Sequence, residues 1–293
     1  MQAEIRNIIQ QLFHMSTQQA QVKPSTLAVA TWRAAHQVLD QPTIFEDPLA
    51  QKILGEEENI FLTKLDAHHN LLSAAMRITI AARSRFAEDE LLASGIDQYV
   101  ILGAGLDTYA YRSLRKSERV FEVDHPSTQA IKKELLRENN ITSYVPVNYV
   151  GCDFENNSLQ RCLVNAGLDI NKKAYFSWLG VVPYLTESAI VETLSAIARC
   201  TPGTQLVFDY IVDPSQLTEV EQCVLNLMGE QLAAGGEPLM SFFSPEKMEY
   251  LLLSAGFTSV QNIDAEYLNA RYLSGLNYPV NVGRVTRMML AEI

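Results

Sequence analysis

The sequence predicts an α/β protein with a mostly parallel sheet of seven strands, preceded by a helical N-terminal region. Up to about residue 95, apolar residues recur three and four positions apart, as in LAVATWRAAHQVL and MRITIAARSRFAEDELL, which is typical of helices. From residue 96, short apolar runs alternate with helical stretches, the pattern of βαβ units and a parallel sheet. We therefore predict a helical cap over residues 1–95 and an α/β core over residues 96–293.

Seven segments of the core have strand patterns. They are the runs at 98–105 and 118–124, the segments YVPVNYVGCDF, KAYFSWLGVV and TQLVFDYIV, and two weaker stretches around 257–263 and 284–291. Ser94-Gly95 ends the last helix of the cap, and Pro126 begins a helix that runs to about Asn139. Thr186 is placed to cap the next helix, and Ser244-Pro245 begins another that ends near Gly256.

Residues 213–243 form a connection longer than a strand and a helix normally require. This stretch lacks a strand pattern and follows the fifth predicted strand. We expect it to be helical, to cover the open end of the sheet and to act as a substrate lid.

The composition excludes several classes of protein. The 23 basic and 34 acidic residues give a net charge of −11, and the scattered basic residues provide no surface for nucleic acid. No apolar run reaches the roughly 18 residues of a membrane span, and MQAEIRNIIQQLFHMSTQQ lacks the apolar stretch of a secretory signal. We expect a cytoplasmic protein that does not associate with membranes.

The four cysteines also exclude a class of site. Cys152, Cys162, Cys200 and Cys223 contain no CxxC pair, and no histidine lies near them at ligand spacing. We therefore expect neither a metal site nor a disulfide framework.

The strongest motif is GAGLDT, Gly103 to Thr108, directly after the first predicted strand. Its glycines allow a sharp turn and a close approach to a ligand, at the place where open α/β sheets bind nucleotides. A tight turn without a ligand would have the same appearance. The third glycine of the dinucleotide fingerprint is replaced by Thr108, which makes a pyrophosphate ligand a weaker expectation.

Acidic residues follow the next two strands. Asp124 ends the second strand, where a carboxylate can accept hydrogen bonds from ribose hydroxyls, and Glu122 on the same face is the second choice. Asp153 follows the third strand and can accept a bond from an adenine amino group, while Phe154 packs on the ring. Together with the glycine loop, these residues indicate an adenosine ligand.

The sequence then resembles a known family. The segments STLAVATWRAAHQ, FEDPLA, ARSRFAEDEL, YVILGAGLDTYAYR, FEVDHP, GCDF and SWLGVVPYLT are similar to those of the leucine carboxyl methyltransferase-like family, especially its bacterial small-molecule O-methyltransferases. They occur in the family's order from about residue 25 to 210. The resemblance implies a Rossmann-like class I methyltransferase fold and S-adenosyl-L-methionine as cofactor.

The resemblance also implies roles for individual residues. Arg83 matches the arginine that holds the methionine carboxylate, although the sequence alone favours a salt bridge from Arg83 to Glu88 or Asp89. The implied cofactor-binding residues are Arg83, Gly103, Gly105, Asp107, Asp124, Asp153 and Phe154. Leu179 stands where the protein-modifying members have a glutamate, which favours a small hydroxyl or carboxylic acid as acceptor.

The acceptor side is less defined. Tyr184 is expected near the transferred methyl, as a catalytic residue or as an aromatic that fills the mouth of the sheet. Three tyrosines of the C-terminal region either line an aromatic acceptor pocket or contribute ordinary packing: Tyr267, Tyr272 and Tyr278. His125 is expected to start a helix rather than act as a base, and His68-His69 to lie on a helical surface.

We therefore predict an O-methyltransferase for a small molecule of secondary metabolism. Three alternatives remain open at this point: a protein C-terminal carboxyl methyltransferase, a nicotinamide oxidoreductase, and a protein that binds an adenosyl ligand without turnover.

Overall fold

A computed structural model describes residues 23–55, 71–115 and 118–293 of the chain. Its centre is one seven-stranded sheet with the order β3-β2-β1-β4-β5-β7-β6. The strands are β1 Gln98–Leu102, β2 Arg119–Asp124, β3 Val147–Gly151, β4 Ala174–Trp178, β5 Gln205–Ile211, β6 Ser259–Ile263 and β7 Thr286–Glu292. The first five are parallel, and β7 is antiparallel to both β5 and β6. The predicted mostly parallel sheet is confirmed.

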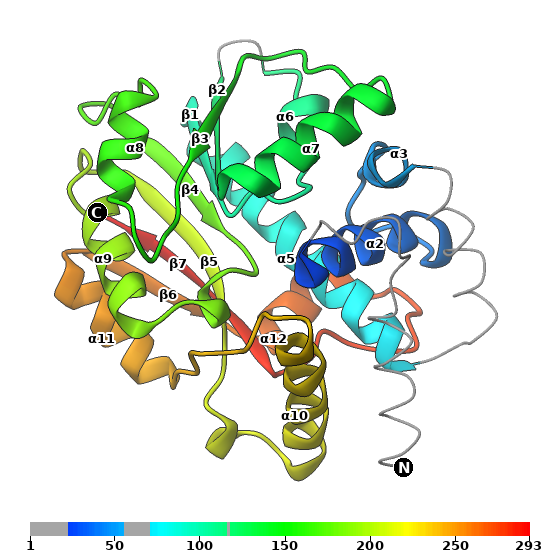
Figure 1. Ribbon diagram of the computed structural model, residues 1–293. Coiled ribbons are helices and arrows are strands. Elements are labelled where there is room, and N and C mark those ends of the chain that lie inside the picture. The colour runs from blue at the N-terminus through cyan, green and yellow to red at the C-terminus, as the bar shows by residue number, and fades with distance from the viewer. Residues whose placement is uncertain (1–22, 56–70, 116–117) are drawn as a thin grey trace.

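Helices cover both faces of the sheet (Figure 1). The longer ones are α2 Pro24–Leu39, α5 Leu71–Ser94, α7 Pro126–Glu138, α9 Glu187–Ile197, α10 Glu219–Ala234 and α11 Pro245–Ala255. Shorter ones are α3 Ala50–Leu54, α6 Tyr109–Arg112, α8 Leu159–Asn165 and α12 Ala265–Leu268. One apolar cluster lies on the face of the sheet that is covered by α8, α9 and α11. A second cluster lies on the other face and includes residues of α2, α3, α5 and α12.

The burial of the strands follows from this three-layer arrangement. Every residue of β1 and β4, the two central strands, is buried, as expected for strands covered on both faces. The carboxyl ends of the parallel strands then meet at one edge of the sheet. Open α/β sheets bind ligands at this edge, between the two central strands where the strand order reverses.

The predicted helix boundaries agree with the structure at the positions that carry caps. The Thr186 side chain accepts a bond from the Ala189 amide and caps α9, and Ser244 caps α11 in the same way through Lys247. Gly256 ends α11 in the left-handed conformation, at φ +113°. His125 is the N-cap of α7 and accepts a bond from the Ser127 amide, as predicted. His68-His69 lie outside the described residues.

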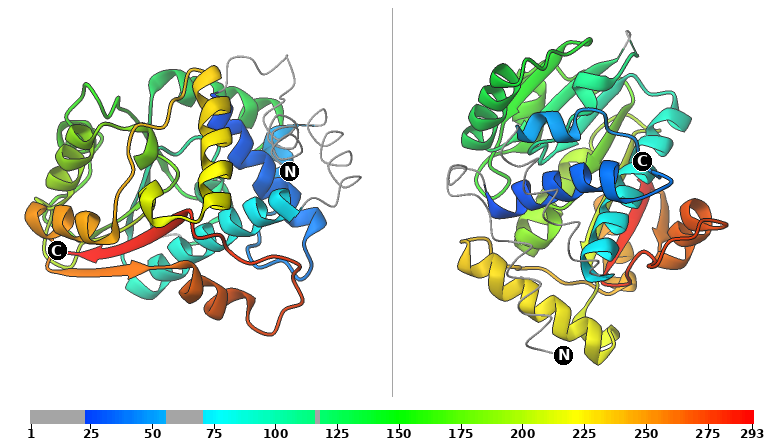
Figure 2. Two further views of the ribbon diagram at one scale, coloured as in Figure 1. Left: turned by 90° about the horizontal axis from the view of Figure 1, so that it is seen from below. Right: turned by 90° about the vertical axis from the view of Figure 1, so that its right-hand side faces the viewer.

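The predicted lid is helical over α10. This helix begins with a capping box in which Thr218 and Glu221 exchange side-chain and backbone hydrogen bonds. Its C-terminal end lies beside the N-terminal end of α2, as the left view of Figure 2 shows. Beyond α10, Glu237 accepts bonds from the Ser25 amide at 2.8 Å and the Ser25 hydroxyl at 2.9 Å. The segment after α10 is therefore bonded to the start of α2.

The division into a cap and a core remains a prediction, and the packing joins the two parts closely. One apolar cluster contains residues of α2, α3 and α5 together with residues of β1 and β2. The predicted boundary coincides with the end of α5 at Ser94. In the described residues, no helix is both long enough and apolar enough to span a membrane.

Candidate functional site

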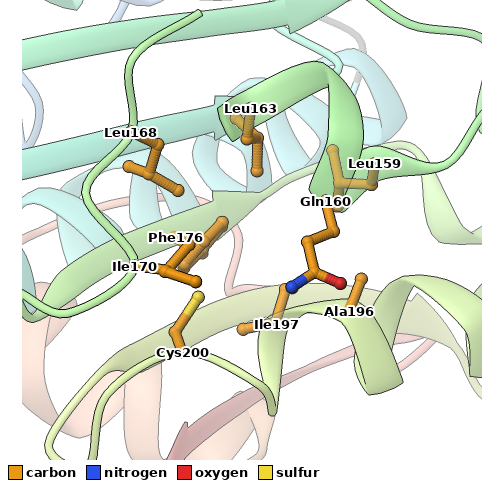
Figure 3. A pocket seen from close by; sticks show the side chains of 9 residues that line it. All are labelled: Leu159, Gln160, Leu163, Leu168, Ile170, Phe176, Ala196, Ile197 and Cys200. Carbon is orange, nitrogen blue, oxygen red and sulfur yellow. The ribbon is translucent and has the colours of Figure 1, made fainter. Parts of the chain in front are cut away.

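A cavity of about 620 Å³ lies at the carboxyl ends of the central strands. The eight residues predicted from the sequence all line it: Arg83, Gly103, Gly105, Asp107, Asp124, Asp153, Phe154 and Tyr184. They come from α5, from the end of β2 and from the segments that follow β1, β3 and β4. A second pocket, between α8 and α9, has about 10 Å³ and apolar walls around Cys200 (Figure 3), so it has room for no more than a water molecule.

The glycine loop after β1 forms the floor of the cavity. Gly103 has φ +69°, and a Cβ built there would lie 2.2 Å from Cγ2 of Val181, so no side chain fits at this position. The Gly103 and Ala104 amides both donate to the Val123 carbonyl, at 2.8 and 3.0 Å, which turns the chain sharply at the end of β1. The loop therefore brings bare backbone to the surface of the cavity.

Asp124 fixes this loop from the end of β2. Its Oδ2 accepts a hydrogen bond from the Gly105 amide and its Oδ1 accepts one from the His125 amide, both at 2.6 Å. The carboxylate is half-buried and still reaches the cavity. Carboxylate oxygens have further lone pairs, so Asp124 retains acceptor capacity for ligand hydroxyls.

Glu122, the second choice for the ribose contact, was a wrong prediction. It does not line the cavity: its side chain is buried beneath α7 and forms an ion pair with Lys132, with 2.7 Å between Oε2 and Nζ. Residues two apart in a strand share a face, but only the residue at the strand end passes the edge of the sheet. Burial raises the pKa of Glu122 to about 7, while Lys132 opposes the shift.

Asp153 and Phe154 lie in the turn after β3. The Asp153 carboxylate accepts bonds from Nδ2 of Asn156 at 2.8 Å and from the Glu155 amide at 2.9 Å. These bonds, that from Asn156 foremost, lower the pKa of Asp153 below its usual value and keep it an ionised acceptor. Phe154 packs toward Trp178, with 6.2 Å between ring centroids, and turns an aromatic surface to the cavity.

Asp107 is tied to the N-terminal helices. Its Oδ2 lies 3.1 Å from Nη1 of Arg33, and its Oδ1 accepts a bond from the Tyr109 amide at 2.7 Å. Burial would raise the pKa of Asp107, but the charges of Arg33, Arg112 and Lys132 and the bond from the Tyr109 amide together outweigh burial, so the pKa lies below the usual value. Arg33 also pairs with the buried Asp47. Arg33 and Asp47 both belong to segments on which the resemblance rests, but no pattern in the sequence indicates that they pair.

Arg83 does not bond to Glu88 or Asp89, so that alternative was wrong. Its Nη1 donates to Oδ2 of Asp209 at 2.7 Å, and Oδ1 of the same aspartate accepts the Gly180 amide at 2.5 Å. Arg83 Nε is buried and has no hydrogen-bond partner in the part of the chain that the structure describes. The guanidinium thus faces the cavity while the pair with Asp209 fixes one end of it.

Asp209 is the main site residue that sequence reasoning missed. It lies inside β5, is 3% exposed and lines the cavity. An acidic residue within an otherwise apolar strand, TQLVFDYIV, was the available signal, because a buried carboxylate requires a partner.

Tyr184 lies in a short 3-10 turn, Val182–Tyr184, after β4 and lines the cavity as predicted. Burial raises the pKa of its phenol above the usual value, and the charge of Glu237 raises it further. The phenol is therefore neutral at physiological pH. It can donate a hydrogen bond, but it is a poor proton acceptor in this state.

The three C-terminal tyrosines serve packing and not the cavity. Tyr267 packs edge-on against Phe86, Tyr272 donates to Oδ2 of Asp89, and Tyr278 donates to the carbonyl of Pro42. None of them lines the cavity, so of the two alternatives left open by the sequence the structure supports ordinary packing.

The comparisons with known proteins agree with this site. The model of the leucine carboxyl methyltransferase family matches residues 26–198, which is 173 of the 293 residues. The chain belongs to the leucine carboxyl methyltransferase family. YktD of Bacillus subtilis strain 168, which bears the name of an S-adenosyl-L-methionine-dependent methyltransferase, is 31% identical over 277 residues, covering 85% of this chain and 91% of its own.

Solved structures of other proteins share the fold of this chain. A DUF574 family protein of Streptomyces avermitilis has a TM-score of 0.57 at 13% identity and covers 90% of this chain and 96% of its own. A protein of Thermobifida fusca described as a methyltransferase has a TM-score of 0.54 at 17% identity, covering 90% and 93%. The predicted resemblance, the Rossmann-like class I fold and the class of S-adenosylmethionine-dependent methyltransferases are thereby confirmed.

Proposed function

We propose that the protein transfers the methyl group of S-adenosylmethionine to a carboxylate or hydroxyl oxygen of a small molecule, in secondary metabolism. One observation carries the proposal. The cavity that contains the Gly103 loop, Asp124 and Asp153 also extends between α5 and α10, which supports binding of an acceptor beside the adenosyl ligand.

The residues present fit the adenosyl ligand. The glycine loop brings backbone to the cavity at Gly103 and Gly105, and the buried Nε of Arg83, which has no partner among the described residues, has a donor to offer. In the proposed arrangement, Arg83 holds the methionine carboxylate, Asp124 accepts from the ribose, and Asp153 with Phe154 receives the adenine. Gly105 and Asp107 complete the loop beneath the ligand. When bound, S-adenosylmethionine supplies an electrophilic methyl group on a sulfonium sulfur.

The remaining task of the chain is to align an acceptor oxygen and exclude water. The neutral Tyr184 phenol can donate a hydrogen bond to that oxygen and orient it. A carboxylate acceptor arrives ionised and needs no base, whereas a hydroxyl acceptor benefits from a hydrogen-bond acceptor nearby. Glu237 lines the cavity close to Tyr184 and is available for that second case.

The first test is calorimetric titration with S-adenosylmethionine, S-adenosylhomocysteine and NAD. We expect the two adenosyl ligands to bind, NAD not to bind, and Asp124→Ala to weaken adenosyl binding by about tenfold or more, because it removes the ribose contact and releases Gly105. Asp213→Ala is the matched control, since Asp213 follows β5 but lies outside the cavity. Binding of NAD instead would contradict the proposal.

The second test distinguishes the acceptor types. Candidate hydroxy and carboxylic acids are incubated with protein and S-adenosylmethionine, and methylated products are identified by mass spectrometry. Mild alkaline hydrolysis removes a methyl ester and leaves a methyl ether intact. Methylation of peptides with a free C-terminal carboxylate, in place of small molecules, would favour the protein-modifying alternative. Adenosyl binding without any product would favour a non-catalytic protein.

A further inference from the structure

The cavity extends along α5, beyond the residues that are proposed to bind the adenosyl ligand. Leu72, Met76, Thr79 and Ile80 line it, spaced three and four residues apart on the helix face that also carries Arg83. Leu72 lies about 16 Å from Arg83 along the helix axis, because each helical residue adds about 1.5 Å. This wall of the cavity is therefore long and almost wholly apolar.

A second apolar wall comes from α10. Val220, Val224, Met228 and Leu232 line the same cavity at four-residue spacing, so they too form one face of their helix. Leu232 is buried at the inner end, whereas Val220 is 56% exposed at the outer end. The stripe thus runs from the interior of the molecule to solvent. Two such stripes along one cavity suit a ligand that is itself elongated and apolar.

Arg284 is an exposed cation at the rim of the cavity. Among the described residues three arginines line the cavity, and two of them are paired: Arg33 with Asp47 and Asp107, and Arg83 with Asp209. Arg284 has no ion pair or hydrogen bond in the described part of the chain, although the protein is strongly acidic overall. The neighbouring Gly283 amide donates to Oγ1 of Thr79 at 3.3 Å, which holds this segment against the apolar face of α5.

We propose that the methyl acceptor is an elongated amphipathic anion. Its apolar body lies between the faces of α5 and α10, and its anionic group pairs with Arg284 at the rim. An unpaired guanidinium beside an apolar wall matches the chemistry of such a molecule at both ends. This inference rests on the proposed function, because it assigns the compartment next to the adenosyl residues to the acceptor.

The test measures binding of dodecanoate to the protein saturated with S-adenosylhomocysteine, by calorimetry. We expect dodecanoate to bind, hexanoate to bind much more weakly because it covers less of the two stripes, and neutral dodecanol to lose the contribution of Arg284. Arg284→Gln should weaken dodecanoate binding about twofold to fivefold. Lys23→Gln is the matched control, since Lys23 also lines the cavity but lies on the side of Asp153.

A second pair of variants tests the apolar wall. Val224→Asp places a charge on the stripe and should abolish dodecanoate binding, while Asn226→Asp places the same charge on an exposed part of α10 outside the cavity and should not. Both variants should retain their affinity for S-adenosylhomocysteine. Met228→Gln replaces Val224→Asp if the latter fails to fold.

The outcomes separate the two proposals. Binding of S-adenosylhomocysteine without binding of dodecanoate, or dodecanoate binding that Val224→Asp leaves unchanged, overturns this inference and leaves the proposed function standing. An Arg284→Gln variant that binds dodecanoate as tightly as the wild type overturns the assignment of the anionic group. Failure of S-adenosylhomocysteine to bind overturns both proposals.

Discussion

The pair of Arg83 and Asp209 shows how one buried residue can organise several parts of a site. Asp209 reaches Arg83 of α5 with one carboxylate oxygen and the Gly180 amide after β4 with the other. An arginine without this partner would have several rotamers available in a cavity of this size. In the proposed arrangement, Asp209 is therefore a positioning residue that would act on the methionine carboxylate of the ligand through Arg83.

We expect Asp209→Asn to weaken S-adenosylmethionine binding about tenfold and to leave 5′-methylthioadenosine binding nearly unchanged, because the latter lacks the amino acid moiety that Arg83 would hold. Calorimetric titration of both ligands checks this prediction. Equal losses for the two ligands would indicate a general structural defect, and the positioning role would then be wrong.

Glu122 and Lys132 form an ion pair that is about 1% exposed and lies away from the cavity. Because burial raises the pKa of Glu122 to about 7, the native state binds more protons than the unfolded state between about pH 4.5 and 7. The contribution of this group to stability is therefore largest at acid pH and falls as the pH rises toward 7.

Lys132→Met should destabilise the protein by about 3 kcal/mol near pH 8, because it leaves a buried carboxylate without its counter-charge. The loss should be smaller near pH 5, where Glu122 can be protonated. Urea unfolding at the two pH values measures both. The double variant with Glu122→Gln should remove the pH dependence; an equal loss at both pH values in Lys132→Met would contradict the assignment.

Among the site residues, the sequence predicted those that belong to a motif at the end of a strand. Asp124, Asp153 and the glycine loop follow strand ends, and the structure brings them to one cavity. Asp209, Glu237 and Arg284 carry no such mark, since their place depends on which strands and helices become neighbours. The sequence could not decide whether Asp124 or Glu122 reaches the ligand site. In the structure α7 covers Glu122 and leaves Asp124 at the cavity.

At the scale of elements, α10 is both a wall of the cavity and a connection to α2. The bonds between Ser25 and Glu237 join the segment after α10 to the start of α2. A Cβ on Gly235 would lie 2.8 Å from Cγ of Pro24, which shows how closely the two segments approach. The predicted role of residues 213–243 as a substrate lid therefore depends on α10.

Replacing residues 218–236 with a short flexible linker should abolish acceptor binding and turnover while adenosyl binding is largely kept, because Asp124, Asp153 and the glycine loop are not part of this segment. Calorimetry with S-adenosylhomocysteine and with dodecanoate distinguishes the two effects. Loss of affinity for both S-adenosylhomocysteine and dodecanoate would contradict the lid prediction, provided that circular dichroism shows the rest of the chain to be folded.

The sequence predicted most elements correctly because local signals mark them. Thr186, Ser244 and Gly256 fix helix ends through hydrogen bonds within a few residues, and these bonds do not depend on the rest of the fold. The sequence also predicted that residues 213–243 contain a helix. It did not show that the end of this helix meets Pro24 and Ser25, about two hundred residues away in the chain.

For the whole molecule, the apolar cluster shared by α2, α3, α5, β1 and β2 argues for unfolding as one unit. We expect differential scanning calorimetry to show a single transition with equal calorimetric and van't Hoff enthalpies. S-adenosylhomocysteine should raise its midpoint, since the ligand binds only the folded state. Two separate transitions would show that residues 1–95 and 96–293 are independent domains.

The place of β7 in the sheet has a consequence for how the protein is made. Strand β7 lies between β5 and β6, although it is synthesised after both of them. While a ribosome is translating the residues between β6 and β7, the nascent chain carries β6 without a neighbouring strand and leaves the edge of β5 uncovered. During that interval, chaperones that bind exposed apolar strands could bind the uncovered edge of β5.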